Sequence, residues 1–289
     1  MKQRVITAFS LLGLLFLVVW QINTPLIVVV VSFFAAVAAL EIMQCAKITN
    51  RFLLIAGCAV AVFVQFFATN TALEPFVSAE YWDGVVNYVP LTVYVGALIM
   101  AYFIAMLADY AHTKFEDVAI AIVASVFVPY AFSMLIKLRD IAGYKTQFGT
   151  LLIFYGFICA MGTDMGAQLI GMKFGKRKMS PNISPKKSWE GAIGGIVVGF
   201  ALNVVAIVLY NCFAGKALDN KTMAILLIAS PFIQVLSMMG DLSASVLKRN
   251  FDVKDFGKIF PGHGGVMDRF DSSMFTLPVT YALGLFILN

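Results

Sequence analysis

The feature that most constrains this chain is a series of apolar runs, each long enough to cross a bilayer as one helix, that recurs along the sequence. About 20 apolar residues in a helix match the thickness of the hydrocarbon layer. Hydrophobic residues make up 61% of the 289 residues and charged residues only 13%, and the mean hydropathy is +0.88. A soluble domain is nearer one-half apolar and one-quarter charged. The chain is therefore predicted to be an all-α, polytopic integral membrane protein.

About nine transmembrane helices are expected, and eight or ten are the alternatives because the first and last runs are short. The expected spans are 5–21, 25–44, 52–69, 88–108, 117–137, 149–173, 189–213, 222–247 and 273–288. A transmembrane β-barrel would instead show alternating segments of about ten residues, which this sequence lacks. Spans that follow one another so closely leave no room for a separate soluble domain, so residues 1–289 are expected to form a single membrane domain.

The distribution of basic residues predicts the orientation of the chain. Most of the 21 Lys and Arg residues fall on one side if the N-terminus lies inside, and cytoplasmic loops are usually enriched in Lys and Arg. The N-terminus is therefore expected inside, the C-terminus outside, and the two most basic loops in the cytoplasm. The segment between the fifth and sixth spans departs from this rule, because it carries Lys137, Arg139 and Lys145.

The most polar stretch of the chain runs from Asp241 to Asp271 and contains a glycine-rich loop at 261–265. Asp241 and Ser245 are four residues apart, so they share a face if the segment is helical. Asp241 and Asp268, on different segments, can together hold magnesium, which accepts a couple of carboxylates and leaves positions for water and phosphate oxygens. The alternative for each aspartate alone is an ion pair with a neighbouring Lys or Arg.

Asp164 lies within the sixth expected span. A carboxylate inside a membrane is costly, and such residues are functional candidates by default. The alternative is a structural partner for a lysine or a helix–helix hydrogen bond.

The stretch Ser184-Pro185-Lys186-Lys187-Ser188-Trp189-Glu190-Gly191 precedes the seventh span. Pro185 suits a first helical turn, and Ser184 or Ser188 can cap the helix that follows. The N-terminus of a helix beside two lysines can bind phosphate. The glycines of this span, Gly191, Gly195 and Gly199, are spaced by four residues, which favours close packing against another helix.

Three groups of residues at fixed spacing form one long pattern: Ser245-x-Leu247-Lys248-Arg249, then Lys254-Asp255-x-Gly257, then Pro261-x-His263-Gly264-Gly265-Val266-x-Asp268-Arg269-Phe270-Asp271. The pattern resembles the signature of phosphatidate cytidylyltransferases, also called CDP-diacylglycerol synthases, without a departure. The Asp164 region and residues 184–191 also resemble this family. The resemblance is strong over about residues 150–275, whereas the first 140 residues match only as generic spans.

The resemblance implies an enzyme that converts CTP and phosphatidic acid into CDP-diacylglycerol and pyrophosphate. It implies a requirement for magnesium held by Asp241 and Asp268, with potassium as a candidate second cation, and it implies a homodimer. Residues 1–148 would supply N-terminal transmembrane helices, and residues 149–275 the catalytic helices and cytoplasmic loops.

The reactants bring many negative charges together, so cations and ordered polar groups are expected around them. The catalytic candidates are Asp241, Asp268, Lys248, Arg249 and Arg269. The substrate-binding candidates are Asp164, Ser184, Lys186, Lys187, Ser188, Glu190, Ser245, His263 and Asp271. His263 is expected to contact substrate or to order the loop. A general base is not needed, because a phosphate monoester has a second pKa near 6 and already acts as a nucleophile at pH 7.

The expected partners are CTP, phosphatidic acid, the lipid bilayer and a second copy of the chain, with no nucleic acid. The expected location is the bacterial inner membrane, with the site on the cytoplasmic side. The alternative function is a CTP-dependent lipid kinase of the polyprenol or phytol type. A transporter that uses Asp164 and Asp241 would leave the glycine-rich loop unexplained, and a CDP-alcohol phosphotransferase would require a DGxxAR segment that is missing.

Overall fold

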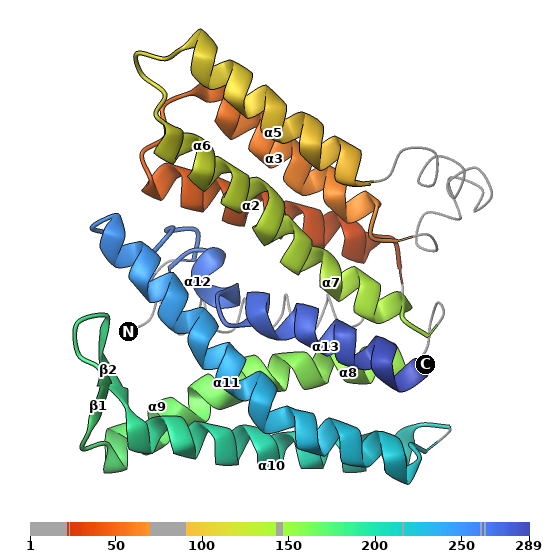
Figure 1. The fold of residues 1–289 in the computed structure, drawn as a ribbon. Helices are drawn as coiled ribbons and strands as arrows, with labels where there is room; N and C mark the ends of the chain where they lie inside the picture. The colour runs from red at the N-terminus through yellow and green to blue at the C-terminus, as the bar shows by residue number, and fades with distance from the viewer. Residues whose placement is uncertain are drawn as a thin grey trace, which may run out of the picture. The chain divides into compact units, whose positions relative to one another are not determined.

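The structure is a computed structural model, and it describes residues 22, 24–69, 91–142, 147–215, 217–260, 262 and 264–289. Over these residues the chain is almost entirely helical, with two short strands (Figure 1). It divides into two compact units. Unit 1 comprises Met1–Asp140 and Val253–Arg269, and unit 2 comprises Ile141–Asp252 and Phe270–Asn289. The helical fold class is confirmed, whereas a single membrane domain with parts 1–148 and 149–275 stays a prediction.

Unit 1 is a group of helices around α2. Its elements are α2 (Leu26–Cys45), α3 (Arg51–Phe66), α5 (Leu91–Ala108), α6 (Phe115–Ile122), η1 (Val123–Phe127) and α7 (Val128–Asp140). Helix α2 packs against α3 and α7, and its Ala35, Ala38 and Ala39 are fully buried. Such small side chains let neighbouring helices approach closely in membrane proteins.

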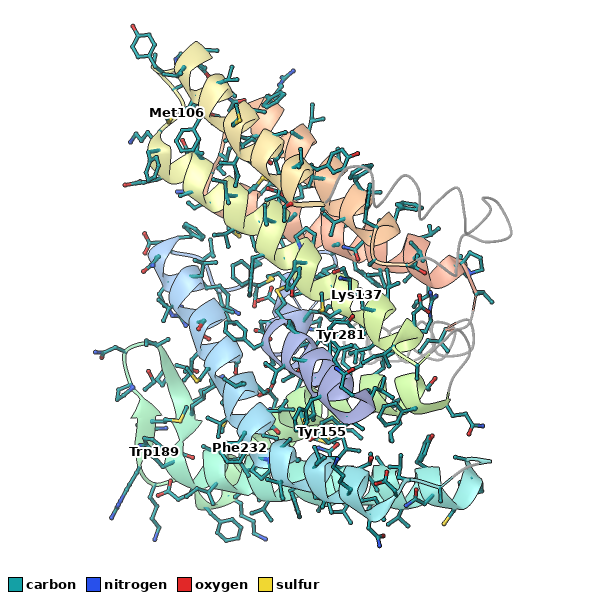
Figure 2. The ribbon with its side chains drawn as sticks, turned by 45° about the vertical axis from the view of Figure 1, so that its right-hand side comes forward. Met106, Lys137, Tyr155, Trp189, Phe232 and Tyr281 are labelled. Carbon is teal, nitrogen blue, oxygen red and sulfur yellow. The ribbon has the colours of Figure 1, made fainter. Side chains whose placement is uncertain are left out.

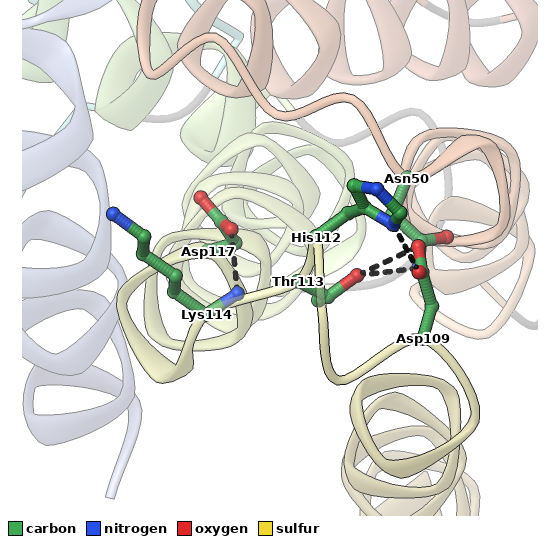
Figure 3. Close-up of polar contacts among 6 residues, drawn as sticks. All are labelled: Asn50, Asp109, His112, Thr113, Lys114 and Asp117. Atoms are coloured by element: carbon green, nitrogen blue, oxygen red, sulfur yellow. Dashed lines mark hydrogen bonds and ion pairs between the residues drawn. The ribbon is translucent and has the colours of Figure 1, made fainter.

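Polar contacts fasten the turns at one end of unit 1 (Figure 3). Asn50 accepts a hydrogen bond from Phe52 N at 3.0 Å and so caps α3, and its Nδ2 donates to Thr113 Oγ1 at 2.9 Å. Thr113 in turn donates to Asp109, whose carboxylate also lies 2.8 Å from His112 Nδ1. The turn before α3 is thereby tied to the turn between α5 and α6.

The environment of Arg139 explains part of the departure from the rule that Lys and Arg are enriched in cytoplasmic loops. It lies within α7, is 1% exposed, and its guanidinium donates to both carboxylate oxygens of Asp140 at 2.7 and 2.8 Å. Thr69 Oγ1 also accepts from Arg139, at 3.0 Å. Because this charge is buried and neutralised by its neighbour, it does not act as a basic loop residue.

Unit 2 contains the longest helices and the two strands. Its elements are α8 (Gln147–Phe157), η2 (Ile158–Gly162), α9 (Thr163–Phe174), β1 (Lys178–Ser180), β2 (Ser184–Ser188), α10 (Trp189–Phe213), α11 (Asn220–Asn250) and α13 (Ser273–Leu288). The short α12 (Met267–Phe270) crosses the boundary between the units. In the core, the buried Tyr155 hydroxyl donates to Leu226 O at 2.7 Å, which ties α8 to α11 (Tyr155 is labelled in Figure 2).

Strands β1 and β2 form an antiparallel hairpin directly before α10. The prediction that Ser188 caps this helix is confirmed, because Ser188 Oγ accepts from Gly191 N at 3.2 Å. The predictions that Ser184 caps the helix and that Pro185 lies in its first turn are wrong, since both residues belong to strand β2. Pairing with β1 holds this segment extended, so α10 begins only at Trp189.

The glycine stripe of α10 packs against α9, as its spacing predicts. A Cβ on Gly195 would lie 2.6 Å from Thr163 O, and one on Gly191 would lie 2.8 Å from Ala167 O. Gly166 of α9 faces the same seam, because its Cβ would lie 2.7 Å from Val198 Cβ. The two helices therefore approach to a distance that only glycine permits, in the manner of small-residue packing in membranes.

Five helical stretches are long and apolar enough to cross a membrane: Leu26–Cys45, Phe115–Asp140, Gln147–Phe174, Trp189–Phe213 and Asn220–Asn250. Three shorter apolar helices, Arg51–Phe66, Thr92–Ala108 and Ser273–Leu288, coincide with three further expected spans. The expected span 5–21 lies outside the described residues. The count of nine membrane crossings therefore stays a prediction.

Large apolar side chains cover the outside of unit 2. Phe232 of α11 is 70% exposed and Trp189 of α10 is 55% exposed (both labelled in Figure 2). Ile193 and Val197, one and two turns further along α10, are each 62% exposed. In water such surfaces would be unfavourable, whereas a lipid environment accommodates them. Together with the long apolar helices, they identify a membrane protein.

Candidate active site

Three carboxylates gather in unit 2, on α9, on α11 and just before α13. Asp164 lies in the first turn of α9, directly after the π-helical turn η2. Ser272 Oγ donates to Asp164 Oδ2 at 2.8 Å. This contact joins α9 to the start of α13, so Asp164 does make the interhelical hydrogen bond that was the alternative to a functional role. One hydrogen bond leaves the remaining acceptor capacity of a carboxylate available, so the contact is compatible with both roles.

Asp241 of α11 forms an ion pair with Lys187 of β2. Each side chain is 23% exposed, so the pair is partly shielded from water. The hairpin therefore brings one of the two predicted phosphate-binding lysines to a predicted metal ligand. The neighbouring Lys186 is exposed. Side chains alternate in direction along a strand, which separates the environments of the two lysines.

Asp271 lies close to Asp241 and is almost buried, with 9% exposed. A Cβ on Gly240, the residue before Asp241, would lie 3.0 Å from Asp271 O, so the backbones of α11 and residue 271 are in contact. Burial and the nearby charge of Asp241 raise the pKa of Asp271 to about 7, against an opposing effect from Lys248. The carboxyl of Asp271 therefore holds its proton to a higher pH than an ordinary aspartate does.

The hairpin region is held in place by contacts with α10 and α11. Glu190, in the first turn of α10, accepts hydrogen bonds from the backbone N–H groups of Lys176 and Arg177 at 3.0 and 3.1 Å. Arg249 Nε, near the end of α11, donates to Ile183 O at 3.4 Å. Glu190 and Arg249 thus fasten the basic hairpin in this structure, while their predicted roles toward substrate stay predictions.

The part of the signature that belongs to unit 1, Val253–Arg269 (the signature segment), folds around the carboxylate of Asp268. Asp268 Oδ2 accepts hydrogen bonds from Phe256 N at 2.8 Å and from Gly265 N at 3.0 Å. The chain turns back on itself between these residues, where Phe260 N donates to Gly264 O at 2.9 Å. Gly262 and Gly264 have positive φ values of 80° and 86°, which side-chain-bearing residues rarely adopt. Glycine is therefore required by the turn at positions 262 and 264.

A second carboxylate of unit 1, Glu41 of α2, also binds this segment. Glu41 Oε1 accepts from Val266 N at 3.1 Å, and Oε2 accepts from Met267 N at 2.9 Å. Sequence reasoning missed Glu41, although a lone carboxylate inside an apolar run was a usable signal. Its partners lie far along the chain, so the sequence did not indicate which segment it contacts.

The structure describes the predicted site residues in two sets. Unit 2 brings together Asp164, Lys187, Asp241, Lys248 and Asp271 through contacts or electrostatic interactions. It also contains Ser184, Lys186, Ser188, Glu190, Ser245 and Arg249. Asp268 and Arg269 belong to unit 1. His263 lies outside the described residues.

The oxygen-rich side chains of the site are of the type that magnesium prefers. Among the described residues, no group of three His, Cys, Asp or Glu side chains is arranged to hold a metal by itself. A magnesium ion here would therefore depend on one or two carboxylates together with water and substrate oxygens, which is the usual arrangement for this ion. The donor set fits magnesium, and its use stays a proposal.

Comparison with known proteins agrees with the family resemblance found in the sequence. The model of the cytidylyltransferase family matches residues 2–287. The chain is 30% identical to the phosphatidate cytidylyltransferase of Bacillus subtilis (strain 168), over 98% of this chain and 97% of that protein. It is 29% identical to the phosphatidate cytidylyltransferase of Rickettsia typhi, over 78% of this chain and 93% of that protein. It is 40% identical to the phosphatidate cytidylyltransferase of Staphylococcus haemolyticus over 45% of this chain and 48% of that one. The match over nearly its whole length shows that this chain belongs to the cytidylyltransferase family.

Proposed function

We infer that this protein is a phosphatidate cytidylyltransferase, which converts CTP and phosphatidic acid into CDP-diacylglycerol and pyrophosphate. The observation that carries this conclusion is the match to a phosphatidate cytidylyltransferase over 98% of this chain and 97% of the relative. The signature from Ser245 to Asp271 lies within the matched range. The reaction places the protein in phospholipid biosynthesis.

The chemistry requires one phosphate to attack another. The phosphate of phosphatidic acid attacks the α-phosphorus of CTP, the new P–O bond forms there, and the bond to the β-phosphate breaks to release pyrophosphate. A phosphate monoester is largely a dianion at neutral pH, so no base is needed to activate it. The enzyme has to align the two phosphates and neutralise their charge.

The cations of unit 2 suit this task. Lys187 and Lys248 both act electrostatically on the aspartates around Asp241. Arg249 and Lys186 extend the basic surface on the hairpin side. Lys and Arg groups that are already in place where negative charge develops cost no reorganisation during the reaction. We assign Lys187, Lys248 and Arg249 of unit 2 to the phosphates, with Lys186, Ser184, Ser188 and Ser245 as further contacts. Arg269 of unit 1 is assigned to the phosphates as well.

The aspartates argue for a metal ion as well. Asp164, Asp241 and Asp271 would repel a triphosphate if nothing lay between them and the nucleotide. Magnesium held by Asp241 and Asp268 would remove this repulsion and withdraw charge from the phosphate oxygens. Potassium is the candidate for a second cation. Asp164 and Asp271 then order the surroundings of Asp241, and His263 orders the loop or contacts substrate.

The setting of the enzyme follows from its substrates. Phosphatidic acid is a membrane lipid and CTP is dissolved in the cytoplasm, so the site has to open to both. We propose the bacterial cytoplasmic membrane, with the N-terminus and the site on the cytoplasmic face, and a homodimer as the assembly. Light scattering of the purified protein tests the dimer, and labelling of single introduced cysteines from either side tests the orientation.

The reaction is tested with the purified full-length protein in detergent–lipid micelles. Release of pyrophosphate that depends on both CTP and phosphatidic acid is expected, with a lipid product that contains cytidine. Asp241→Asn and Asp268→Asn should each lower turnover by about a hundredfold or more, as for loss of a key electrostatic group. Ser243→Ala, an exposed change on the same helix as Asp241, is the control. Absence of pyrophosphate, or an Asp268→Asn variant of near-normal activity, contradicts the proposal.

A further inference from the structure

Helix α2 presents two side chains to the signature segment of unit 1. Glu41 accepts the backbone N–H groups of Val266 and Met267. Cys45, one helical turn further along, donates from Sγ to Phe256 O at 3.0 Å. Residues four apart on a helix lie on one face. One face of α2 therefore contacts both the beginning and the end of the segment that contains Asp268.

The position of Glu41 is unusual for a structural residue. It is only 4% exposed and lies in one of the helices long enough to cross a membrane. A buried carboxylate is unfavourable unless hydrogen bonds satisfy it. Both oxygens of Glu41 accept a backbone N–H group, which compensates for the burial and at the same time fixes the backbone at residues 266 and 267.

Two glycines of the signature are explained by the same carboxylate. A Cβ on Gly257 or on Gly265 would overlap the carboxylate of Glu41. The turn does not demand glycine at these two positions, since neither is among the glycines with positive φ. Close approach of Glu41 is therefore the reason that the segment has no side chain at either position.

Glu41 and Asp268 act on the same short stretch of backbone. Asp268 Oδ2 accepts from Gly265 N, and Glu41 accepts from the next two N–H groups, those of Val266 and Met267. Asp268 also accepts from Phe256 N. Because three consecutive N–H groups are held by two carboxylates, the direction of the Asp268 side chain is set relative to α2. Hydrogen bonds of this kind orient groups that bind metals or substrates.

We propose that Glu41 is a positioning residue for this enzyme, which holds the signature segment on α2 and thereby sets the orientation of Asp268. Glu41 contacts backbone only and does not itself take part in the reaction. The consequence for catalysis rests on the proposed function, whereas the effect on the segment does not. The N-terminal half of the chain then contributes to the position of Asp268 through α2.

The first measurement is hydrogen exchange of residues 253–270 in the metal-free, full-length protein. Glu41→Gln keeps the size of the side chain but replaces one acceptor oxygen with an NH2 group, which cannot accept from a backbone N–H. Faster exchange at Val266 and Met267 is expected, with exchange elsewhere in unit 1 unchanged. Ser32→Ala, a buried change on the same helix, and Gln44→Ala, an exposed one, should leave the segment as in the wild type. Unchanged exchange in Glu41→Gln overturns the proposal.

The second measurement is the magnesium dependence of the reaction. If Glu41 orients Asp268, Glu41→Gln should raise the magnesium concentration at half-maximal rate by roughly ten- to a hundredfold, as for other groups that orient ligands. A smaller folded fraction alone would scale the rate and leave this concentration unchanged, and that result would count against the positioning role. A wild-type protein that releases no pyrophosphate counts against the proposed function, while the exchange measurement still decides the structural role of Glu41.

A double-mutant cycle covers the case in which Glu41→Gln folds poorly. Gly257→Ala should disturb the segment strongly in the wild type, because its Cβ would overlap Glu41. In a Glu41→Ala background the overlap is gone, so the same change should have a much smaller effect on exchange at residues 253–270. Non-additivity of this sign is the signature of two residues in contact. Additive effects would overturn the proposal.

Discussion

Lys187 at the hairpin and Asp241 on α11 form an ion pair in unit 2. The pair joins a predicted phosphate-binding lysine to a predicted metal ligand, so the carboxylate already carries a positive partner before any substrate arrives. A magnesium ion at Asp241 would compete with the lysine for this carboxylate and would release the ammonium group toward a phosphate. The pair therefore links the two proposed roles of these residues.

Replacing Lys187 should make the protein more dependent on magnesium for its stability. Lys187→Ala leaves Asp241 unpaired beside Asp271 and Asp164, and the free energy of unfolding without metal should fall by roughly 1–3 kcal/mol. Magnesium that binds the folded protein adds stability by mass action, so it should raise Tm more in the variant than in the wild type. Lys186→Ala, on the exposed side of the strand, is the control. An equal magnesium effect in all three proteins would argue against a metal at Asp241.

The buried carboxyl of Asp271 should make stability depend on pH. Its pKa is raised from 3.8 to about 7, so between these values the folded protein binds more protons than the unfolded chain, and stability falls as pH rises. The contribution is fully present below about pH 4 and is lost as pH passes 7. Asp271→Asn should flatten this part of the profile and be more stable than the wild type above pH 7, by an amount on the order of a few kcal/mol. Thermal unfolding in chelator across pH 4–9 measures it, and parallel profiles for the two proteins would contradict the assignment.

Two adjacent serines at the start of α13 provide a matched pair of variants. Ser272 donates to Asp164 at 2.8 Å, whereas the Ser273 hydroxyl is buried with no hydrogen-bond partner. Ser272→Ala should therefore lower the free energy of unfolding by about 1–3 kcal/mol, because it leaves a partly buried carboxylate without this bond. Ser273→Ala should be close to neutral. Equal shifts in Tm for the two variants would show that the contact to Asp164 does not stabilise unit 2.

The seam between α9 and α10 should not tolerate a single methyl group. Gly195→Ala would place a Cβ 2.6 Å from Thr163 O, and such overpacking costs about 1–3 kcal/mol. Gly96→Ala, on α5, has no atom within 4 Å of the new Cβ and should be neutral or slightly stabilising, because alanine favours helix. The difference in Tm between the variants measures the tightness of the seam. A tolerated Gly195→Ala would mean that the helices are less closely packed.

The sequence predicts the positions of the helices well, because each apolar run is long and ends at charged or polar residues. The run 189–213 coincides with α10, and the run 273–288 coincides with α13. The run 149–173 differs from the helical stretch Gln147–Phe174 by one or two residues. The π-helical turns η1 and η2 were not predicted, since they change only the local hydrogen-bond pattern and leave the hydropathy unchanged.

The parts that the sequence did not predict depend on contacts between distant residues. Ser184 and Pro185 were expected at the start of the following helix, but pairing with Lys178–Ser180 places them in strand β2. The segment 184–188 contains a proline and two serines, which are residue types common at the start of a helix. Its local sequence therefore favours a helix start as much as it favours a strand. The contact of Glu41 with Val266 joins two positions 225 residues apart, and no local pattern records such a partner.

The measurement that tests the central claim most directly is the fate of labelled CTP phosphates. The purified protein is incubated with phosphatidic acid, magnesium and CTP that is labelled either at the α-phosphate or at the γ-phosphate. A phosphatidate cytidylyltransferase transfers the α-label to the lipid and releases the γ-label as pyrophosphate, and we expect this result. Transfer of the γ-label to lipid, which is the outcome for a kinase, or a lipid fraction that gains no label, would contradict the account.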